Sequence, residues 1–485
     1  MMTSSRRYGL LALAMVLLGG CAQLPPLAGQ HTTELALPAH WSADTAHADT
    51  VPPEDGARLA QWWRQLGDPQ LDQLIDAALA GSLDLRLAQA RLRQARAGRA
   101  QALSGRYPSL TASVGGSRSD SADVITSSPA RTLYDAGFDA AWEIDVFGAT
   151  QRGIEAATAE LAASEASLNH SRVSLVAEVA RNYVELRTYQ QRAAILRANL
   201  ASQDETLQIT TWRYQAGLAT ESEVEQARAS REQTRAAIPD LEVGRAAAEH
   251  RLAVLLGRNP GALREQLAAY QPLPAVPAAV ASGIPADVLR QRPDLIAAEH
   301  SLAAETARLG QKQAQRFPSL NLGASFGWQA YSLGALGGAD TVARAVSGAL
   351  SVLLFDGGKL RSAIEIQGAV QEQALLDYRH SVLTALEEVE NALTAYAAGR
   401  ERVAARHAAF AAARNAARLA RQMYAVGLTD FQQVLETERS RLTAEDSLAT
   451  AEAGMHTSLI ALYKALGGGW EPAPASSPSD RGTAS

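Results

Sequence analysis

The chain has 485 residues and a formal net charge of −6, with 47% hydrophobic and 20% charged residues. This weakly acidic balance excludes nucleic acid as a partner, because such binding needs a basic surface. The single cysteine excludes an internal disulfide and any metal site with two cysteine ligands. No cofactor motif is present, so no cofactor is expected.

The N-terminus is typical of a targeting segment. Arg6 and Arg7 precede an apolar run over residues 8–18, which small residues follow. This order of a basic, an apolar and a small-residue region predicts a signal peptide over residues 1–20. The apolar run is too short for a permanent transmembrane helix, and no later stretch reaches about 18 apolar residues. A stable membrane role therefore requires strands or a lipid anchor.

The sequence Leu18-Gly19-Gly20-Cys21 resembles a bacterial lipobox, in which alanine or serine is commoner at position 19. The resemblance implies that Cys21 becomes the lipid-modified first residue of the mature chain. Ala22, where an aspartate would retain the lipoprotein, then implies export to the outer membrane. The alternative is an unmodified thiol in a discarded peptide.

Two halves of the sequence repeat each other at a constant offset. The segment Tyr107-Pro108-Ser109-Leu110 returns 210 residues later as Phe317-Pro318-Ser319-Leu320 (317 − 107 = 210). Leu256-Gly257 returns as Leu466-Gly467 at the same separation, here called the repeat offset. A constant offset indicates duplication of one structural unit. The predicted order is a lipidated segment over 21–65, a first repeat over 66–260, a Pro/Ala-rich linker over 261–285, a second repeat over 286–470 and a disordered tail over 471–485.

Each repeat contains two stretches that are predicted to be membrane strands, at about 107–117 and 134–147, then at about 318–330 and 342–355. In the second stretch, apolar residues from Tyr134 to Val146 alternate with polar or small ones over the length that a tilted membrane strand needs. A soluble amphipathic sheet would alternate in the same way. The strand pairs lie between long helices, in a chain with an export signal, and this favours membrane strands over a soluble sheet.

Four strands cannot close a barrel, so several chains have to share one, because an open edge in lipid leaves backbone groups unpaired. If the apolar face meets lipid, the acidic residues of the second stretch line a water-filled lumen that favours cations. These residues are Asp135, Asp139, Glu143 and Asp145.

Helices far longer than those of an ordinary globular domain are predicted over about 150–214 and 359–424, which contain no proline. Leu161, Leu168 and Leu175, with Val179 and Leu186, show the alternating four- and three-residue spacing of a coiled coil. A helix of about 65 residues is roughly 100 Å long, which exceeds any bilayer and suits a conduit across the periplasm.

Each long helix is predicted to end in a tight turn and to return as a hairpin, with turns at about 214–220 and 424–430. Gly217 and Gly427 suit the left-handed position after a helix. Thr220 with Glu223 has capping-box spacing, as has Asp430 with its third neighbour Gln433.

The duplicated unit behind a lipobox resembles the outer membrane factor family, the TolC-like export channels, and is most similar to the NodT-type lipoprotein branch. The resemblance covers roughly residues 60–470. It rests on the order of Trp62-Trp63 with Asp68-Pro69, the two aromatic-Pro-Ser-Leu motifs, Arg292-Pro293-Asp294-Leu295, Phe355-Asp356-Gly357-Gly358 and two Tyr-x-x-Gly-Leu turns.

The resemblance implies a mixed α and β membrane protein in which three chains form a twelve-stranded outer-membrane barrel above a helical periplasmic tunnel. It also implies a periplasmic adaptor (membrane fusion protein) and an inner-membrane pump of the RND, MFS or ABC type. The function would be passive conduction of drugs, toxic organics or metals, opened by an iris-like movement of the helix tips.

The family closes its periplasmic end with a tyrosine, acidic residues and an arginine near these turns. By the resemblance, Tyr424 is the tyrosine, and Glu223 and Glu436 are acidic gate residues. Thr429 and Gln433 depart from the pattern, so the gate is expected to be weaker or differently built. The exposed tips expected to contact the adaptor are Gly217, Leu218, Gly427 and Leu428.

The alternatives divide by class. The nine histidines are scattered and no nucleophile, P-loop or dinucleotide motif is present, so no enzymatic activity is expected. A lipid-anchored structural coiled coil would explain Cys21 and the helices but not the strands. A type I protein secretion channel stays open beside small-molecule efflux.

Overall fold

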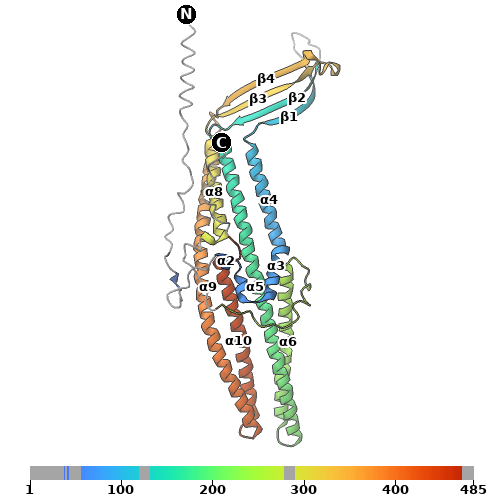
Figure 1. The fold of residues 1–485 in the computed structure, drawn as a ribbon, viewed down its shortest axis with the longest axis vertical. Helices are drawn as coiled ribbons and strands as arrows, with labels where there is room; N and C mark the ends of the chain where they lie inside the picture. The colour runs from blue at the N-terminus through green and yellow to red at the C-terminus, as the bar shows by residue number, and fades with distance from the viewer. Residues whose placement is uncertain (1–37, 39–40, 43–55, 120–130, 278–289, 472–485) are drawn as a thin grey trace. The chain divides into compact units, whose positions relative to one another are not determined.

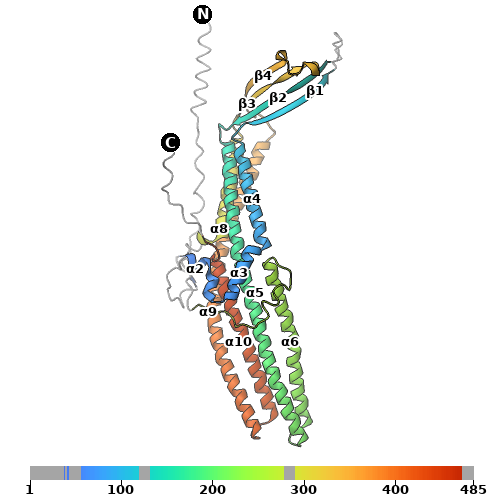
Figure 2. The same ribbon diagram turned by 45° about the vertical axis from the view of Figure 1, so that its right-hand side comes forward.

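The structure is a computed structural model that describes residues 38, 41–42, 56–119, 131–277 and 290–471 (Figures 1 and 2). The described elements lie in one compact unit, Leu37–Ser485, while the other unit, Met1–Ala36, lies outside the described residues together with the predicted signal peptide and Cys21. In chain order, the elements are α2 Gly56–Ala60, η2 Trp62–Leu66, α3 Pro69–Gly81, α4 Leu83–Ser104, β1 Ser109–Ser119, β2 Arg131–Ile144, α5 Ala149–Gln215, α6 Glu221–Leu255, α8 Pro293–Ala314, β3 Ser319–Ala330, η3 Leu333–Ala335, η4 Ala339–Thr341, β4 Val342–Ser351, α9 Lys359–Ala425 and α10 Phe431–Ala465.

The duplication is present in three dimensions with the same repeat offset. Helices α5 and α9 both have 67 residues, and α6 and α10 both have 35. In the sheet, Ser109 lies opposite Ala141, and the corresponding Ser319 lies opposite Ser351. The predicted duplication is therefore confirmed down to the pairing of single residues.

The four strands form one antiparallel sheet in the order β1-β2-β3-β4, so β1 and β4 are its two edges. Figure 1 shows this sheet at one end of the long helices and the two hairpin turns at the other. Side chains alternate between the faces as predicted: Phe138 lies opposite Ala112 and Phe326, whereas Asp139 lies opposite Thr111 and Ser325. One face is thus apolar and the other polar.

Two strand predictions are wrong at their ends, because β2 stops at Ile144 rather than 147 and β4 stops at Ser351 rather than 355. Asp145 consequently lies outside the sheet. Its carboxylate accepts a hydrogen bond of 2.7 Å from the backbone N–H of Gln151 in the first turn of α5. Unpaired N–H groups at a helix start attract a carboxylate, which is why Asp145 serves the helix instead of the strand.

The long helices run nearly as predicted and pack in the order α4, α5, α8, α9, with each hairpin extended by α6 or α10. Leu175, Val179 and Leu186 are buried, as the coiled-coil spacing requires. No helix in the described part of the chain is both long enough and apolar enough to cross a membrane.

The main apolar core lies where α3, α5 and α10 meet η2. Trp62 is fully buried and stacks on Tyr463, with ring centroids 4.9 Å apart. The segment 21–65, predicted to be the lipidated N-terminal segment, therefore ends inside the core. Stacked aromatic rings add about 0.5–1.5 kcal/mol to the burial of their area.

The predicted linker, 261–285, is described as far as residue 277, and this part packs onto the core. Leu263 and Leu267 are fully buried although no helix or strand contains them. The buried Arg187 of α5 donates to the backbone carbonyl of Ala269 (2.9 Å), and Gln190 donates to that of Leu267 (2.7 Å). The described part of the linker thus forms hydrogen bonds with α5 as well as within its own turns, where the N–H of Leu267 donates to the carbonyl of Leu263 at 2.9 Å.

Arg292, immediately before α8, connects the start of the second repeat to the C-terminal end of α10. Its guanidinium donates to both carboxylate oxygens of Asp294, to Glu388 (2.7 Å) and to the carbonyl of Ala465 (3.0 Å). Burial acts to raise the pKa of Asp294, but the hydrogen bonds and charge of Arg292 outweigh it and hold that pKa below its ordinary value.

Asp294→Asn is expected to lower the unfolding temperature at pH 7 by on the order of 2 °C. A carboxyl whose pKa is depressed by folding stabilises the protein above its unfolded pKa, near 4, and this stabilisation is lost as the pH falls through the folded pKa. Thermal unfolding in detergent should therefore show the deficit at pH 7 and a smaller one near pH 3. Asp240→Asn, at an exposed position of α6, is the control, and an equal deficit at both pH values would contradict the linkage.

Candidate functional site

The end of the molecule opposite the sheet is built from two turns of the same design. Gly217 and Gly427 follow their helices with φ of 72° and 75°, in the left-handed region that glycine adopts at little cost. The N–H of Leu218 donates to the carbonyl of Arg213 (2.8 Å), and that of Leu428 donates to Met423 (2.9 Å). These bonds close each helix with a Schellman motif, as the sequence predicts.

The two leucines at the turns are exposed. Leu218 is 69% exposed and Leu428 is 72% exposed, and Val426 beside the second turn is 69% exposed. Large apolar side chains grouped at a helical tip are typical of a surface that contacts another protein.

The helices that follow the turns are capped differently in the two halves. Thr220 and Glu223 form a full capping box, since Glu223 donates its N–H to the Thr220 hydroxyl and its carboxylate accepts from the Thr220 N–H. Asp430 accepts from the N–H of Gln433 (2.9 Å) without the reciprocal bond. Glu223 therefore has the capping role that the sequence offered as one of two possibilities, the other being a role in the gate.

Tyr424 is half-buried between the two hairpins. Its ring lies 5.6 Å from that of Phe431, and the guanidinium of Arg213, from α5, lies 4.5 Å from its centroid. Burial raises the pKa of Tyr424, the charge of Arg213 opposes this, and the charge of Glu223 adds to it. The structure therefore brings Tyr424 and Glu223 into one neighbourhood and adds Arg213 to them.

Arg213 is the residue that sequence reasoning missed. It comes one position before Tyr214, the counterpart of Tyr424 in the first repeat, and no motif distinguishes it. Its guanidinium faces an aromatic ring from the other hairpin, a contact known to bind a cation by about 0.5–2 kcal/mol. Only the packing of α5 against α9 and α10 reveals this pairing.

Glu436 is exposed on α10, and within the described part of the chain its side chain forms no ion pair or hydrogen bond. Two residues further on, Glu438 has a different environment, with 13% of its side chain exposed. Residues two positions apart in a helix point to different faces, so Glu438 faces the neighbouring helices and is paired, whereas Glu436 does not.

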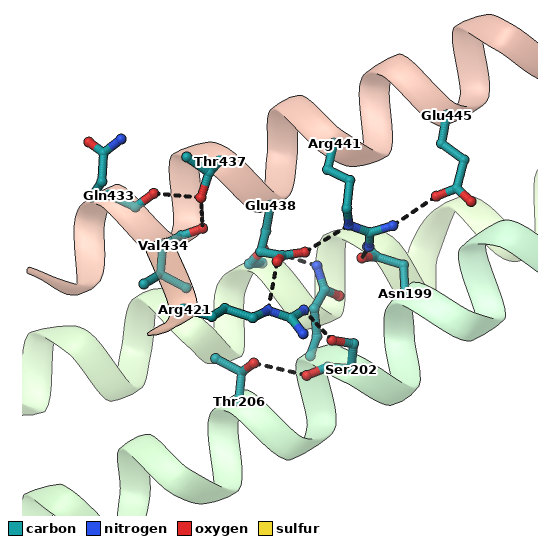
Figure 3. A network of polar contacts seen from close by, with 12 residues as sticks. Asn199, Ser202, Thr206, Arg421, Gln433, Val434, Thr437, Glu438, Arg441 and Glu445 are labelled. Atoms are coloured by element: carbon teal, nitrogen blue, oxygen red, sulfur yellow. Dashed lines mark hydrogen bonds and ion pairs between the residues drawn. The ribbon is translucent and has the colours of Figure 1, made fainter. Parts of the chain in front are cut away.

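A network of polar side chains, here called the Glu438 cluster, joins α5, α9 and α10 further from the turns (Figure 3). One carboxylate oxygen of Glu438 pairs with Arg421 of α9 at 2.7 Å, and the other pairs with Arg441 at 3.0 Å. Arg441 also donates to Asn199 of α5 (2.7 Å), and Arg421 donates to Ser202 of α5. Both arginines thereby attach the first hairpin to the second.

A further pair lies along the same interface. Arg192 of α5 makes two hydrogen bonds, of 2.7 and 3.0 Å, with the carboxylate of Asp446 on α10. This two-point geometry fixes the orientation of both groups. The two hairpins are thus attached at three levels, which are Arg192 with Asp446, the Glu438 cluster, and Arg213 with Tyr424.

Other predicted residues lie at the opposite end. Asp135, Asp139 and Glu143 lie four residues apart along the polar face of β2, where Ser113 donates to Asp139 (3.3 Å). Within the described residues, no group of three or more His, Cys, Asp or Glu side chains is arranged to hold a metal ion.

Comparisons with known proteins identify the family. Residues 74–258 and 284–468 match the family described as outer membrane efflux protein. The chain is 32% identical over 480 residues to the pyoverdine export outer membrane protein OpmQ of Pseudomonas putida, covering 97% of this chain and 99% of that one, and 31% identical to nodulation protein T of Rhizobium leguminosarum bv. trifolii, covering 94% and 96%. Among solved structures, the outer-membrane channel OprN superposes with a TM-score of 0.85 at 36% identity, over 92% of this chain and 99% of that one.

These likenesses confirm the fold class predicted from the sequence, with duplicated units of two strands and long helices in an outer-membrane channel. They also confirm the predicted location in the outer membrane with an extension into the periplasm. The family resemblance carried by the sequence motifs is confirmed as well. The chain belongs to the outer membrane efflux protein family.

Proposed function

We propose that this chain forms the outer-membrane exit duct of a tripartite efflux system, in which three copies share one twelve-stranded barrel and conduct substrate passively. The open four-stranded sheet carries this proposal. Within the described residues, this sheet has one apolar face, one polar face that contains the acidic residues of β2, and two unpaired edges. In lipid each unpaired backbone group costs several kcal/mol, so copies of the same sheet have to complete it.

The substrate class we propose is small molecules rather than proteins. The relative OpmQ is named for the export of pyoverdine, and the matching family is named for efflux. Specificity would be set by the pump and the adaptor. The pump would be of the RND, MFS or ABC type.

The partner at the turns would be a periplasmic adaptor that contacts Gly217, Leu218, Gly427 and Leu428. The exposed leucines supply apolar surface and the glycines allow a close approach of the backbone. Cys21 would carry the lipid anchor that holds the mature chain at the membrane.

The resting gate would be held by attachment of one hairpin to the other within each copy. The ring of Tyr424 would hold the tip through Arg213, with Glu223 and Glu436 supplying negative charge nearby, and the Glu438 cluster would support this contact from above. Opening would separate the hairpins in an iris-like movement, driven by the adaptor.

Reconstitution of the purified, lipidated protein in planar bilayers tests the proposed function. A trimeric mass in detergent, a lipid adduct on the N-terminal peptide and small pores that open rarely are the expected results. A monomer without conductance would leave a lipid-anchored coiled-coil protein, and translocation of a folded or unfolded polypeptide would indicate protein secretion.

Neutralising the acidic face of β2 is expected to reduce cation preference. The triple variant Asp135→Asn, Asp139→Asn, Glu143→Gln removes three carboxylates from each copy of a lumen where rings of acidic side chains attract cations. Reversal potentials under a salt gradient should move toward zero relative to wild type. Asp240→Asn, at an exposed position of α6, is the control; unchanged reversal potentials in the triple variant would show that these residues do not line the pore.

A further inference from the structure

The apolar face of the sheet carries two charged side chains, and both are arginines. Phe138 on β2 and Phe326 on β3 lie opposite each other and define this face. Paired positions share a face, so Arg344 on β4 lies on it opposite Phe326, and Arg118 on β1 lies on it opposite Thr132. Within the four described strands, every other residue of this face is uncharged and every carboxylate lies on the polar face.

Both arginines lie at the end of the sheet that is far from the helices. Strand β1 follows α4 and ends at Ser119, one residue after Arg118. Strand β4 begins at Val342, two residues before Arg344, and leads back to α9. Because the helices extend into the periplasm, this far end of the sheet (Figure 1) is the one that faces the outside of the cell.

Aromatic side chains mark the same level of the sheet independently. Trp328 of β3 lies on the apolar face, with its ring edge-on to that of Phe326 at a centroid distance of 5.4 Å. A Cβ placed on Gly116 would lie 3.3 Å from the ring of Tyr134, so this ring covers β1 two residues before Arg118. Tryptophan and tyrosine concentrate where the hydrocarbon of a membrane meets its headgroups. The arginines therefore lie at headgroup level.

Neither arginine has a partner among the described residues. Both side chains are exposed, and the ion pairs and hydrogen bonds of the described chain include neither of them. Asp340 of η4, the carboxylate nearest to Arg344 in the sequence, forms no ion pair with it. A guanidinium stays charged at any physiological pH, so on a face that meets lipid it requires an anion from the membrane surface.

The surroundings of the arginines fit a phosphorylated lipid. A guanidinium offers two parallel N–H donors that match two oxygens of one phosphate group. On the same face, toward the middle of the sheet, Val114 follows Arg118 and Val346 follows Arg344, with exposures of 85% and 89%. Positive charge at the rim above exposed apolar surface is complementary to a phosphate group above acyl chains.

We propose that Arg118 and Arg344 form a binding site for the phosphate groups of a lipid in the external leaflet, with its acyl chains against the apolar strand residues below. This inference rests on the proposed shared barrel, since only a sheet inside the membrane turns this face to lipid. Strands β1 and β4 are the edges of each sheet, so in a barrel of several copies both arginines lie at the seams and one lipid contacts two copies.

Lipid binding to the purified full chain tests the site. The protein in detergent is titrated with diphosphoryl lipid A and followed by native mass spectrometry, with the dephosphorylated glycolipid and inorganic phosphate as comparison probes. One arginine at an anionic membrane surface contributes about fivefold in affinity, so Arg118→Gln with Arg344→Gln should weaken the binding of diphosphoryl lipid A roughly thirtyfold. Arg118→Lys with Arg344→Lys keeps both charges and should retain most of the binding.

Arg131→Gln is the matched control, because Arg131 lies at the same end of the sheet but on the polar face, with its guanidinium 5.9 Å from the ring centroid of Tyr331. This variant should bind diphosphoryl lipid A as wild type does. Equal binding of the dephosphorylated glycolipid, or displacement of the lipid by an equal concentration of inorganic phosphate, would overturn the assignment to a lipid phosphate.

Conductance and mass of the same samples separate this inference from the proposed function. If the double glutamine variant forms conducting trimers that bind diphosphoryl lipid A as tightly as wild type, the lipid site is overturned and the shared barrel stands. If the wild-type protein is a monomer without conductance, the shared barrel is overturned together with the site.

Discussion

Replacing Tyr424 by alanine is expected to raise the frequency of channel opening by up to roughly tenfold. The alanine removes the ring that contacts Arg213 and Phe431, and together these contacts contribute about 1–2 kcal/mol. Because about 1.4 kcal/mol changes an equilibrium tenfold, this loss suffices to shift the closed tip toward an open one. Single-channel recording and the sensitivity of cells to large antibiotics would both report the change.

Tyr424→Phe is the matched control, because it keeps the ring and removes only the hydroxyl, which makes no hydrogen bond within the described chain. The family resemblance by itself would imply a more open channel from Tyr424→Phe together with Glu223→Gln. The structure assigns the holding contact to the ring, so phenylalanine should behave almost as wild type and Arg213→Gln should resemble alanine. Equal opening in the phenylalanine and alanine variants would refute this assignment.

Glu438→Gln is expected to have the second large effect, on both stability and gating. The carboxylate lies between Arg421 and Arg441, and its loss leaves two cations facing each other in a partly buried site. Removing one partner of a buried ion pair costs about 3 kcal/mol, and a smaller loss is expected here, because the Arg421 side chain is 44% exposed and Arg441 keeps its pair with Glu445. The hairpins should separate more readily, with a lower unfolding temperature in detergent and more frequent opening in bilayers.

Two comparisons make this result specific. Asp240→Asn, on α6 away from the interface, should change neither property. Asn199→Ala removes the acceptor on α5 for Arg441 but keeps the pairs with Glu438, so a smaller increase in opening is expected. If Glu438→Gln lowers the unfolding temperature without altering opening, the cluster stabilises the fold and takes no part in the gate.

Local sequence patterns predicted most of the fold because they depend on neighbours along the chain. Helix α5 was expected over 150–214 and runs from Ala149 to Gln215, since nothing within it interrupts hydrogen bonding. The turn at Gly217 followed from the same local rules. Strand ends were less accurate, because Asp145 can serve either the strand or the following helix, and only the finished helix start decides between them.

The residues of the candidate gate also differ in whether the sequence could predict them. Tyr424 and Glu223 could be named from the family resemblance, and the structure brings them into one neighbourhood. Arg213 and Glu438 could not be named, because their partners lie in the other repeat or on a neighbouring helix, and the rotation of one helix against another selects them. Glu436 and Glu438 are two residues apart in the sequence, but their side chains lie on different faces of α10.

The sequence by itself determined the duplicated unit, the alternating strands and the long hairpins, since each follows from a period or a constant offset along one chain. The order of short motifs determined the family. Tertiary structure decided which charges pair between hairpins, where the strands end, and that the described part of the linker belongs to the core. Those outcomes depend on distances between residues far apart in sequence. Such distances become defined only when the helices pack, and patterns along the sequence do not specify them.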